Sequence, residues 1–328
     1  MREKADPRNL VFTSAELATA HVKLAEKIQS EPGVTWGIKS VDDKVLPMRG
    51  GDVTLLCARP GMGKTTIMAY LAQREAENII KRDARGREVV IYATWEGTVD
   101  AIYAAIIAGR GGYTSSDYYW GRVPMDKIKR NMVKAGTMPI MMLGFSTVRK
   151  DPAPMMTLDA LFQAIESIEE DFNLHPTLVC LDYLQLIPNP GSSDKVDQVS
   201  QAIVNAKMLG MKMDVPFVLG AQASRRVDGY GVKLPTMSDV QWTSQAEQHT
   251  DKLFGLWRPA QTEAPDIRGR SPLIEVDGKS YEANERLLIM RMVKQRGEHG
   301  RHSWGMHLAP ELLELTELET RRLNDGQD

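Results

Sequence analysis

Residues 58–65, which read ARPGMGKT, have the types and spacing needed to hold a phosphate group. Gly61 and Gly63 permit backbone dihedrals, and a close approach to phosphate oxygens, that residues with a side chain resist. The amides of such a loop, together with the first turn of a following helix, present positive partial charge to an anion. In this pattern the ammonium of Lys64 reaches the β- and γ-phosphates, and the hydroxyl of Thr65 ligates Mg²⁺.

The segments on either side place this loop between a strand and a helix. The β-branched and apolar run 53–57 predicts a strand, and residues 64–81 predict a helix. Strand, glycine-rich turn and helix in that order are the context that a phosphate-binding P-loop requires, although Ala58 stands where the pattern normally has glycine. The sequence therefore predicts binding of ATP with Mg²⁺, through Arg59, Pro60, Gly61, Met62, Gly63, Lys64, Thr65 and Thr66.

Three polar residues, Glu96, Asp182 and Gln222, each follow an apolar run typical of a buried parallel strand. Ligands of parallel α/β sheets bind outside the carboxyl ends of the strands. Beside a P-loop, Asp182 fits the acid that holds Mg²⁺, and Glu96 fits the group that polarises the attacking water. Gln222 can donate an amide hydrogen bond to phosphate. The alternatives are a solvated loop acid at Glu96 and an ordinary loop glutamine at Gln222.

Two cations, Lys294 and Arg296, close a later apolar strand at 287–293. One interpretation is a solvated strand end. The other is catalytic, because an arginine can stabilise the negative charge that develops during phosphoryl transfer. If a neighbouring subunit supplied that arginine, hydrolysis would depend on assembly.

Predicted strands alternate with predicted helices along most of the 328 residues. This pattern predicts an α/β fold, a mostly parallel central sheet with helices on both faces. We expect a lead with an amphipathic helix in residues 1–34, one ATPase domain in 35–318 and a polar tail in 319–328. The helix at 14–29 has an apolar face that covers either its own domain or a neighbouring subunit, because periodicity alone does not say whose surface it meets.

The composition excludes some classes of protein. No apolar run reaches the length of a membrane span and no signal-peptide stretch is present at the N-terminus, so we expect a cytoplasmic protein without a membrane partner. The net charge of −2 gives no global argument for nucleic-acid binding. Such binding has to come from a local patch or from assembly into a ring.

Taken together, these motifs resemble the C-terminal RecA-like ATPase domain of DnaB-type replicative helicases over about residues 35–310. The segments that carry the resemblance are ARPGMGKT at 58–65, Glu96, LDYLQLI at 181–187, QASR at 222–225, PTMSD at 235–239 and KQRG at 294–297. The LDYLQLI run and its distance from the P-loop are the most specific of these.

The resemblance implies a hexameric ring with ATP bound between subunits, acting on single-stranded DNA with a primase or loader as a further partner. It assigns Lys64 and Thr65 to phosphate and Mg²⁺, Glu96 to catalysis, Asp182 to Mg²⁺, Gln222 to sensing the γ-phosphate, and Lys294 and Arg296 to the neighbour's nucleotide. It also implies that the helix at 14–29 corresponds to the family's linker helix, which docks on the adjacent subunit.

Two departures from the family pattern concern partners other than ATP. The family usually has an N-terminal helical domain that recruits primase, whereas about thirty residues precede the core here. After Asp239 the family commonly has Arg-Glu-Ser-Gly near the DNA backbone, and residues 241–244 are Gln-Trp-Thr-Ser instead. Trp242 either stacks on a base or packs on its own domain. The candidate DNA contacts are Arg225, Arg226, Lys233, Gln241 and Trp242.

We therefore expect a helicase-type motor, an ATP hydrolase that forms a ring, translocates on single-stranded DNA and unwinds duplex. The alternative is a RecA-like ring ATPase that is not a helicase, such as a recombination mediator or a regulatory switch. A loader-like module without robust turnover is a third interpretation. The presence of Glu96, Lys294 and Arg296 speaks against it.

Overall fold

The computed structural model describes residues 11–31, 33–148, 156–188, 194–240, 248–263, 271–297 and 300–318. Its main sheet has nine strands in the order β11-β10-β9-β6-β1-β5-β4-β2-β3. The strands are β1 (Val53–Ala58), β2 (Glu88–Thr94), β3 (Ile140–Leu143), β4 (His175–Asp182), β5 (Phe217–Gln222), β6 (Lys252–Trp257), β9 (Leu287–Gln295), β10 (His302–Ala309) and β11 (Glu314–Glu317).

The sheet has a parallel part and an antiparallel part. The six strands from β6 to β3 run parallel, whereas β9, β10 and β11 continue the sheet antiparallel. We call the side where the parallel strands end the carboxyl edge, and the side where they begin the amino edge. Because β9 runs against β6, the last residues of β9 lie at the amino edge.

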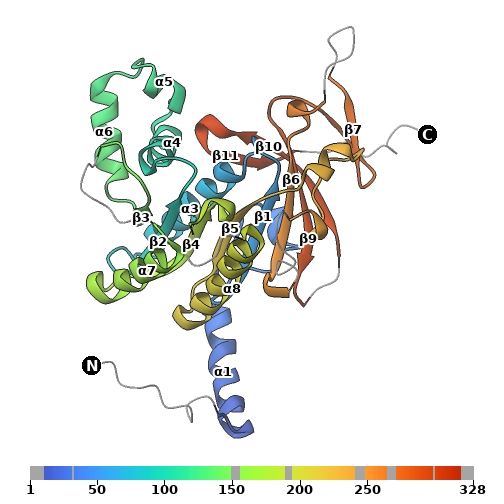
Figure 1. Cartoon of the computed structure of the whole chain (residues 1–328). Coiled ribbons are helices and arrows are strands. Elements are labelled where there is room, and N and C mark those ends of the chain that lie inside the picture. Colours follow the sequence, from blue (N-terminus) through green and yellow to red (C-terminus); the bar gives the residue numbers. More distant parts are fainter. Residues whose placement is uncertain are drawn as a thin grey trace, which may run out of the picture.

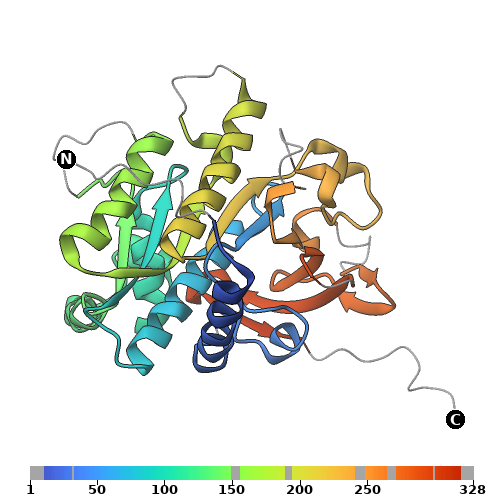
Figure 2. The ribbon, with the colours of Figure 1, turned by 90° about the horizontal axis from the view of Figure 1, so that it is seen from below.

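The central strand β1 is buried along its whole length, since β5 and β6 flank it in the sheet and helices cover both faces. Figure 2 shows α7 and α8 on one side of the sheet and α3 on the other. The helices are α1 (Ser14–Ser30), α2 (Lys39–Asp42), α3 (Lys64–Lys81), α4 (Val99–Gly111), α5 (Ser115–Tyr119), α6 (Met125–Ala135), α7 (Leu158–Phe172) and α8 (Lys195–Met213). This arrangement confirms the expected fold class.

Each face of the sheet has its own hydrophobic core. On the α3 face, Trp36 packs edge-on against Phe254 with 4.8 Å between ring centroids. On the α7 and α8 face, the apolar stripe of α7 packs against the strands. Cys57 and Cys180 are buried and form no disulfide, and burial raises the pKa of both thiols. They act as small apolar core residues, Cys180 on the α3 face and Cys57 on the α7 and α8 face.

Two parts of the chain lie at the margin of these cores. Helices α4, α5 and α6 form a small module beside β3, with a cluster of its own around Ile107 and Tyr113, and Ile102 and Ile106 of α4 join that module to the core on the α3 face (Figure 1). Helix α1 projects from the body of the molecule, and none of its residues is buried. Its first turn is fixed by a capping box between Thr13 and Glu16, so the helix forms from local interactions.

The structure adds elements that the sequence pattern did not indicate. The proline- and glycine-rich region after β6 includes a two-stranded hairpin, β7 (Leu273–Val276) and β8 (Lys279–Glu282), and β11 extends the sheet beyond β10. The candidate DNA contacts Gln241 and Trp242 lie outside the described residues. The division into 1–34, 35–318 and 319–328 stays a prediction.

Candidate nucleotide site at the carboxyl edge

The glycine-rich loop joins the end of β1 to the start of α3 at the carboxyl edge. Gly61 has φ +77° and Gly63, the residue before the first turn of α3, has φ +93°. Both values lie in the left-handed region that favours glycine. A Cβ at Gly61 would meet no atom within 4 Å, so the backbone there faces open space. The loop can thus present its amides and the α3 N-terminus to an anion.

Lys64 lies at the base of this loop with its ammonium turned inward. Its Nζ donates to the backbone oxygen of Ala58 at 3.2 Å and lies 5.7 Å from the ring centre of Tyr183. The residue is 8% exposed, and this burial lowers the pKa of Lys64. A buried ammonium bonded to a neutral carbonyl, beside a ring face, has capacity left for an anionic ligand.

Asp182 ends β4 beside the loop and is fully buried. The Tyr92 hydroxyl donates to its Oδ2 at 3.1 Å, and its Oδ1 has no hydrogen-bond partner of ordinary geometry among the described residues. Burial raises the pKa of Asp182 to about 6, against the lowering effect of the nearby Thr65 hydroxyl. A free buried carboxylate oxygen next to a hydroxyl is an oxygen donor set that suits Mg²⁺. Thr65 and Asp182 therefore fit the metal that the P-loop pattern implies.

Glu96 lies on the turn that follows β2, the strand next to β4. Thr94 is opposite Asp182 in the register of the two strands, and the Trp95 amide donates to the Asp182 backbone oxygen at 2.9 Å. Glu96 is exposed, and its negative charge contributes to the raised pKa of Asp182. A carboxylate in this position can reach a water molecule outside the loop.

Gln222 ends β5 opposite Ala58 of β1, which puts it at the same edge as the loop. Its backbone amide donates to the side-chain oxygen of Gln185 at 3.1 Å, and Gln185 is 4% exposed. Gln185 thus holds the end of β5 from the turn after β4. Motif spacing assigned Gln185 no role, although a glutamine inside the apolar run 181–187 was a signal for a buried polar contact.

Arg59 joins the loop to the segment after β5. Its Nε donates to Asp228 at 3.0 Å and its guanidinium donates to the Ala223 oxygen at 3.1 Å. Asp228 belongs to the short helix η3 (Arg225–Gly229). The loop and the candidate DNA-contacting segment are therefore directly connected.

The basic candidates on that segment differ in their surroundings. Arg225 is exposed, whereas Arg226 donates to the Ser238 oxygen at 2.7 Å and lies 3.7 Å from Asp239. Lys233 pairs with Glu263. All three follow β5, and so they leave the sheet from the carboxyl edge.

Lys294 and Arg296 do not join this site. They end β9 at the amino edge, where the Arg296 amide donates to the Asp251 backbone oxygen at 2.8 Å. Asp251 in turn pairs with Val53, the first residue of β1. The loop follows Ala58 at the other end of β1, roughly 17 Å away for five steps along a strand. The structure therefore brings together Lys64, Thr65, Glu96, Asp182 and Gln222, and separates Lys294 and Arg296 from them.

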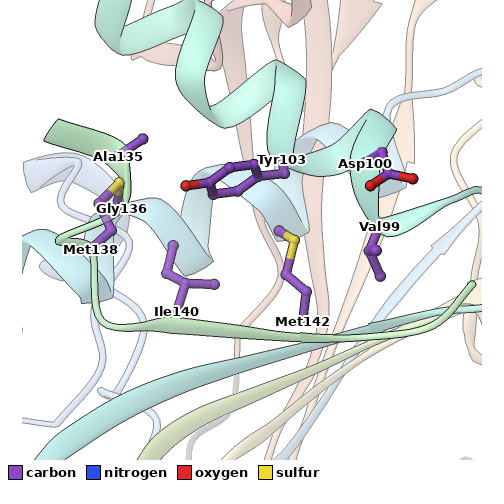
Figure 3. Close-up of a pocket in the computed structure, with 8 residues that line it drawn as sticks. All are labelled: Val99, Asp100, Tyr103, Ala135, Gly136, Met138, Ile140 and Met142. Carbon is purple, nitrogen blue, oxygen red and sulfur yellow. The ribbon is translucent and has the colours of Figure 1, made fainter. Parts of the chain in front are cut away.

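A cavity of about 290 Å³ lies elsewhere, between α4, the end of α6 and β3 (Figure 3). In Figure 3, Tyr103 of α4 lies above Ile140 and Met142 of β3. The one charged lining residue is Asp100, whose carboxylate accepts hydrogen bonds from Ser146 and Thr147. The mostly apolar lining offers no phosphate or metal donor set, so this cavity is distinct from the nucleotide site.

The described residues contain neither a membrane span nor a clustered metal site. None of the helices placed there combines the length and apolarity needed to cross a bilayer. No group of three or more His, Cys, Asp and Glu side chains is arranged to hold a metal in that part of the chain.

Comparison with known sequences identifies proteins that are similar to this chain. A family model described as the DnaB-like helicase C terminal domain matches residues 33–300. The replicative DNA helicase DnaB of Rickettsia bellii is 25% identical over 230 residues, 69% of this chain and 45% of that protein. The corresponding helicase of Haemophilus influenzae is 24% identical over 256 residues, 77% of this chain and 52% of that protein. The chain thus spans about half the length of the curated relatives it matches.

Solved structures share the fold. An ATPase domain solved on its own has a TM-score of 0.73 and 18% identity, and the match covers 94% of this chain and all of that domain. A DnaB-like replicative helicase, solved in a study of its interactions with primase, has a TM-score of 0.71 and 19% identity over 92% of this chain and 66% of that one. A KaiC-like protein of Pyrococcus horikoshii OT3 has a TM-score of 0.53 and 14% identity, over 88% of this chain and 99% of that one. The fold is that of a RecA-like P-loop NTPase.

Proposed function

We propose, because the chain belongs to the family of DnaB-like helicase C-terminal domains, that it forms a ring and hydrolyses Mg-ATP between subunits to translocate on single-stranded DNA and unwind duplex. The observation that supports this most strongly is the split of the predicted catalytic set. Five of its members share the carboxyl edge, while Lys294 and Arg296 lie at the amino edge, too far away to act on the same nucleotide. A ring of copies would bring one subunit's amino-edge cations to the next subunit's nucleotide.

At the carboxyl edge each residue has a separate task. The loop amides and Lys64 bind the β- and γ-phosphates, and Thr65 and Asp182 hold Mg²⁺, which neutralises phosphate charge when bound. Glu96 orients and polarises the attacking water, and Gln222 donates to the γ-phosphate. Arg296 of the adjacent copy stabilises the charge that develops on the transferred phosphoryl group, with Lys294 beside it.

Helix α1 supports assembly, because it exposes an apolar stripe that its own subunit leaves uncovered. Leu17, Leu24 and Ile28 are each at least 42% exposed, while Lys27 pairs with Asp214 and anchors the helix near α8. We propose that a neighbouring subunit covers this stripe. Leu24→Glu should shift the oligomer toward monomer in sedimentation, whereas Lys23→Glu on the same helix should not.

The DNA contact is proposed for the segment after β5, where Arg225 and Arg226 are exposed and Lys233 follows in the sequence. Trp242 would stack on a base, a contact worth about 1–3 kcal/mol. Trp242→Ala should therefore weaken single-strand binding by about 5- to 150-fold. Unchanged binding would assign Trp242 to packing. We further propose a cytoplasmic location and a primase or loader as partner, as expected for a replication motor.

The deciding experiment measures the rate of ATP hydrolysis with and without single-stranded DNA, together with unwinding of a forked duplex. We expect DNA to stimulate hydrolysis and the fork to be unwound, with Lys64→Ala inactive in both assays. Stimulation without unwinding would replace the helicase by a RecA-like ring ATPase of another kind. A rate of ATP hydrolysis that stays the same when single-stranded DNA is added would overturn the proposed function.

A further inference from the structure

The amino edge contains a charged cluster around Asp251 that the proposed chemistry does not yet use. Asp251 comes directly before β6, and its side chain is 6% exposed. One carboxylate oxygen, Oδ2, accepts from the Val53 amide at 2.8 Å and from Lys207 Nζ at 2.7 Å. The other, Oδ1, lies 3.4 Å from Nε of Arg296. A single buried carboxylate thus contacts the first residue of β1, helix α8 and the end of β9.

The two oxygens differ in what they do. Oδ2 is committed to the fold, because a buried backbone amide and a lysine that is 17% exposed depend on it. Lys207 also donates to the Gly51 oxygen at 2.7 Å, which fixes its ammonium in place. Since Lys207 neutralises Asp251, the carboxylate does not need Arg296 for charge balance. Oδ1 is therefore free to orient the arginine.

Arg296 is held along one side of its guanidinium group. Nε faces Asp251, and an NH2 hydrogen donates to the Gln248 backbone oxygen at 3.1 Å. The Arg296 side chain is 56% exposed, so its outer edge reaches solvent. A guanidinium carries five N–H donors in a fixed fork, and holding one edge leaves the other for a phosphate.

The residue between Lys294 and Arg296 is fixed as well. Gln295 is 6% exposed, and its side-chain oxygen accepts from the Leu46 amide at 2.9 Å while its amide donates to the Lys44 oxygen at 3.3 Å. The backbone that carries Arg296 is thus anchored, and the remaining freedom is in the arginine side chain. Among the described residues, Asp251 is the charged group placed against Nε of that side chain.

We propose that Asp251 is a positioning residue, which holds Arg296 by its Nε edge so that the outer edge is presented to the nucleotide of the adjacent subunit. This inference rests on the proposed action of Arg296 in trans. A cation fixed in advance stabilises the transition state without reorganising when charge develops. The same carboxylate bonds the start of β1, whose other end leads into the subunit's own P-loop, so one strand lies between the two nucleotide sites that a subunit serves.

The test is the rate of ATP hydrolysis of Asp251→Asn in the full chain, with nucleotide binding and thermal unfolding measured on the same samples. Asparagine keeps an acceptor for the Val53 amide and removes the charge facing Arg296. We expect kcat to fall about tenfold, which is about 1.4 kcal/mol, with KM and nucleotide affinity changed less than twofold. The matched control is Lys207→Gln, which removes the other cation from the same carboxylate and should lower the melting temperature while leaving kcat within about twofold.

Two further variants separate positioning from structure. Asp251→Glu keeps the charge and moves it by one methylene, so it should also slow turnover if position matters. In an Arg296→Ala background, Asp251→Asn should cause no further loss, because the two residues act as one unit.

Each other outcome has a definite meaning. If Arg296→Ala hydrolyses ATP like the wild type, the trans role itself fails. If Arg296→Ala is slow while Asp251→Asn and Asp251→Glu keep the wild-type kcat, only the positioning role is wrong. Equal losses in Asp251→Asn and Lys207→Gln would also overturn it, because they would show a structural effect shared by both variants.

Discussion

The two edges of the sheet differ in how well their polar groups are satisfied. At the carboxyl edge, Asp182 keeps a buried oxygen without a hydrogen-bond partner among the described residues, and the buried ammonium of Lys64 is bonded to a neutral carbonyl. At the amino edge, buried charges are paired within the chain, Asp251 with Lys207 and Lys252 with Asp52, each at 2.7 Å. Buried polar groups without partners cost free energy, so the carboxyl edge gives up stability that a ligand can restore.

This contrast indicates which edge binds a ligand and which edge extends a side chain toward a ligand bound elsewhere. The carboxyl edge has unmet bonding capacity directed at one small volume, which is what a nucleotide and its metal require. The amino edge has little unmet capacity and offers an exposed arginine whose base is fixed. One edge therefore receives a ligand and the other acts on a ligand held elsewhere.

The largest effect is expected from a substitution at the carboxyl edge, which binds the nucleotide. Lys64→Ala removes the buried cation that faces the phosphates, and we expect ATP hydrolysis to fall below detection in a steady-state assay. Removal of a desolvated charge should leave the melting temperature unchanged or higher. Lys81→Ala, at the far exposed end of the same helix, is the control and should hydrolyse ATP normally. Normal turnover in Lys64→Ala would end the nucleotide proposal.

The next largest effect is expected from a substitution of Arg296 at the amino edge. Arg296→Ala should slow hydrolysis by about 10³-fold or more, the range typical of arginines that contact a transferring phosphoryl group. Nucleotide affinity should stay within about threefold, because the loop and metal residues are untouched. Arg301→Ala, an exposed arginine shortly after β9, controls for loss of surface charge. Parallel loss of affinity and turnover in Arg296→Ala would argue against a role in trans.

A third prediction concerns the pairing of buried charges at the amino edge. Asp52→Ala leaves the ammonium of Lys252, whose side chain is 4% exposed, without its carboxylate. Breaking a buried pair in this way typically costs about 3–5 kcal/mol in the free energy of unfolding. Denaturant unfolding measures it. The double variant Asp52→Ala, Lys252→Met should recover most of the loss, and a fully stable Asp52→Ala protein would contradict the contrast between the edges.

The smallest effect concerns Asp182 and depends on pH. Its pKa of about 6 in the folded chain lies above the ordinary value of 3.8, so the folded chain retains a proton that the unfolded chain has lost between these two pH values. Stability of the metal-free protein should therefore decline as pH rises from about 4 to about 6, by about 2 kcal/mol from this group. Asp182→Asn should flatten that decline. Mg-ATP should stabilise the wild type more at pH 7.5 than at pH 5.5, and a flat wild-type profile would contradict the burial argument.

The site residues at the carboxyl edge could be predicted from local sequence. The loop, its strand and its helix are contiguous, and Asp182 and Gln222 could be placed because parallel strands end at a common edge. The position of Arg296 could not be predicted in this way. An apolar run at 287–293 looks the same in either direction, and only pairing with β6 decides that β9 runs backwards.

Residues that act by positioning other residues could not be predicted from motifs either. Gln185 and Asp251 hold Gln222 and Arg296 through contacts 37 and 45 positions apart in sequence, distances that no local spacing encodes. The β7–β8 hairpin is short and set among turn-forming residues, so its period-two pattern was too brief to separate from a loop.

The reversal of β9 also constrains how the length of this chain can vary. Because β1 pairs with β6 and β6 pairs with β9, the separation between the phosphate loop and Arg296 is set by the strand residues between them, about 3.3 Å each, apart from one extra residue of β9, Val293, at a register shift opposite Leu253 and Phe254. An insertion within one of these strands would shift that separation and turn alternate side chains to the opposite face. Insertions in the β7–β8 hairpin would leave it unchanged. We therefore expect engineered length changes to be tolerated at the hairpin and rejected in the three strands.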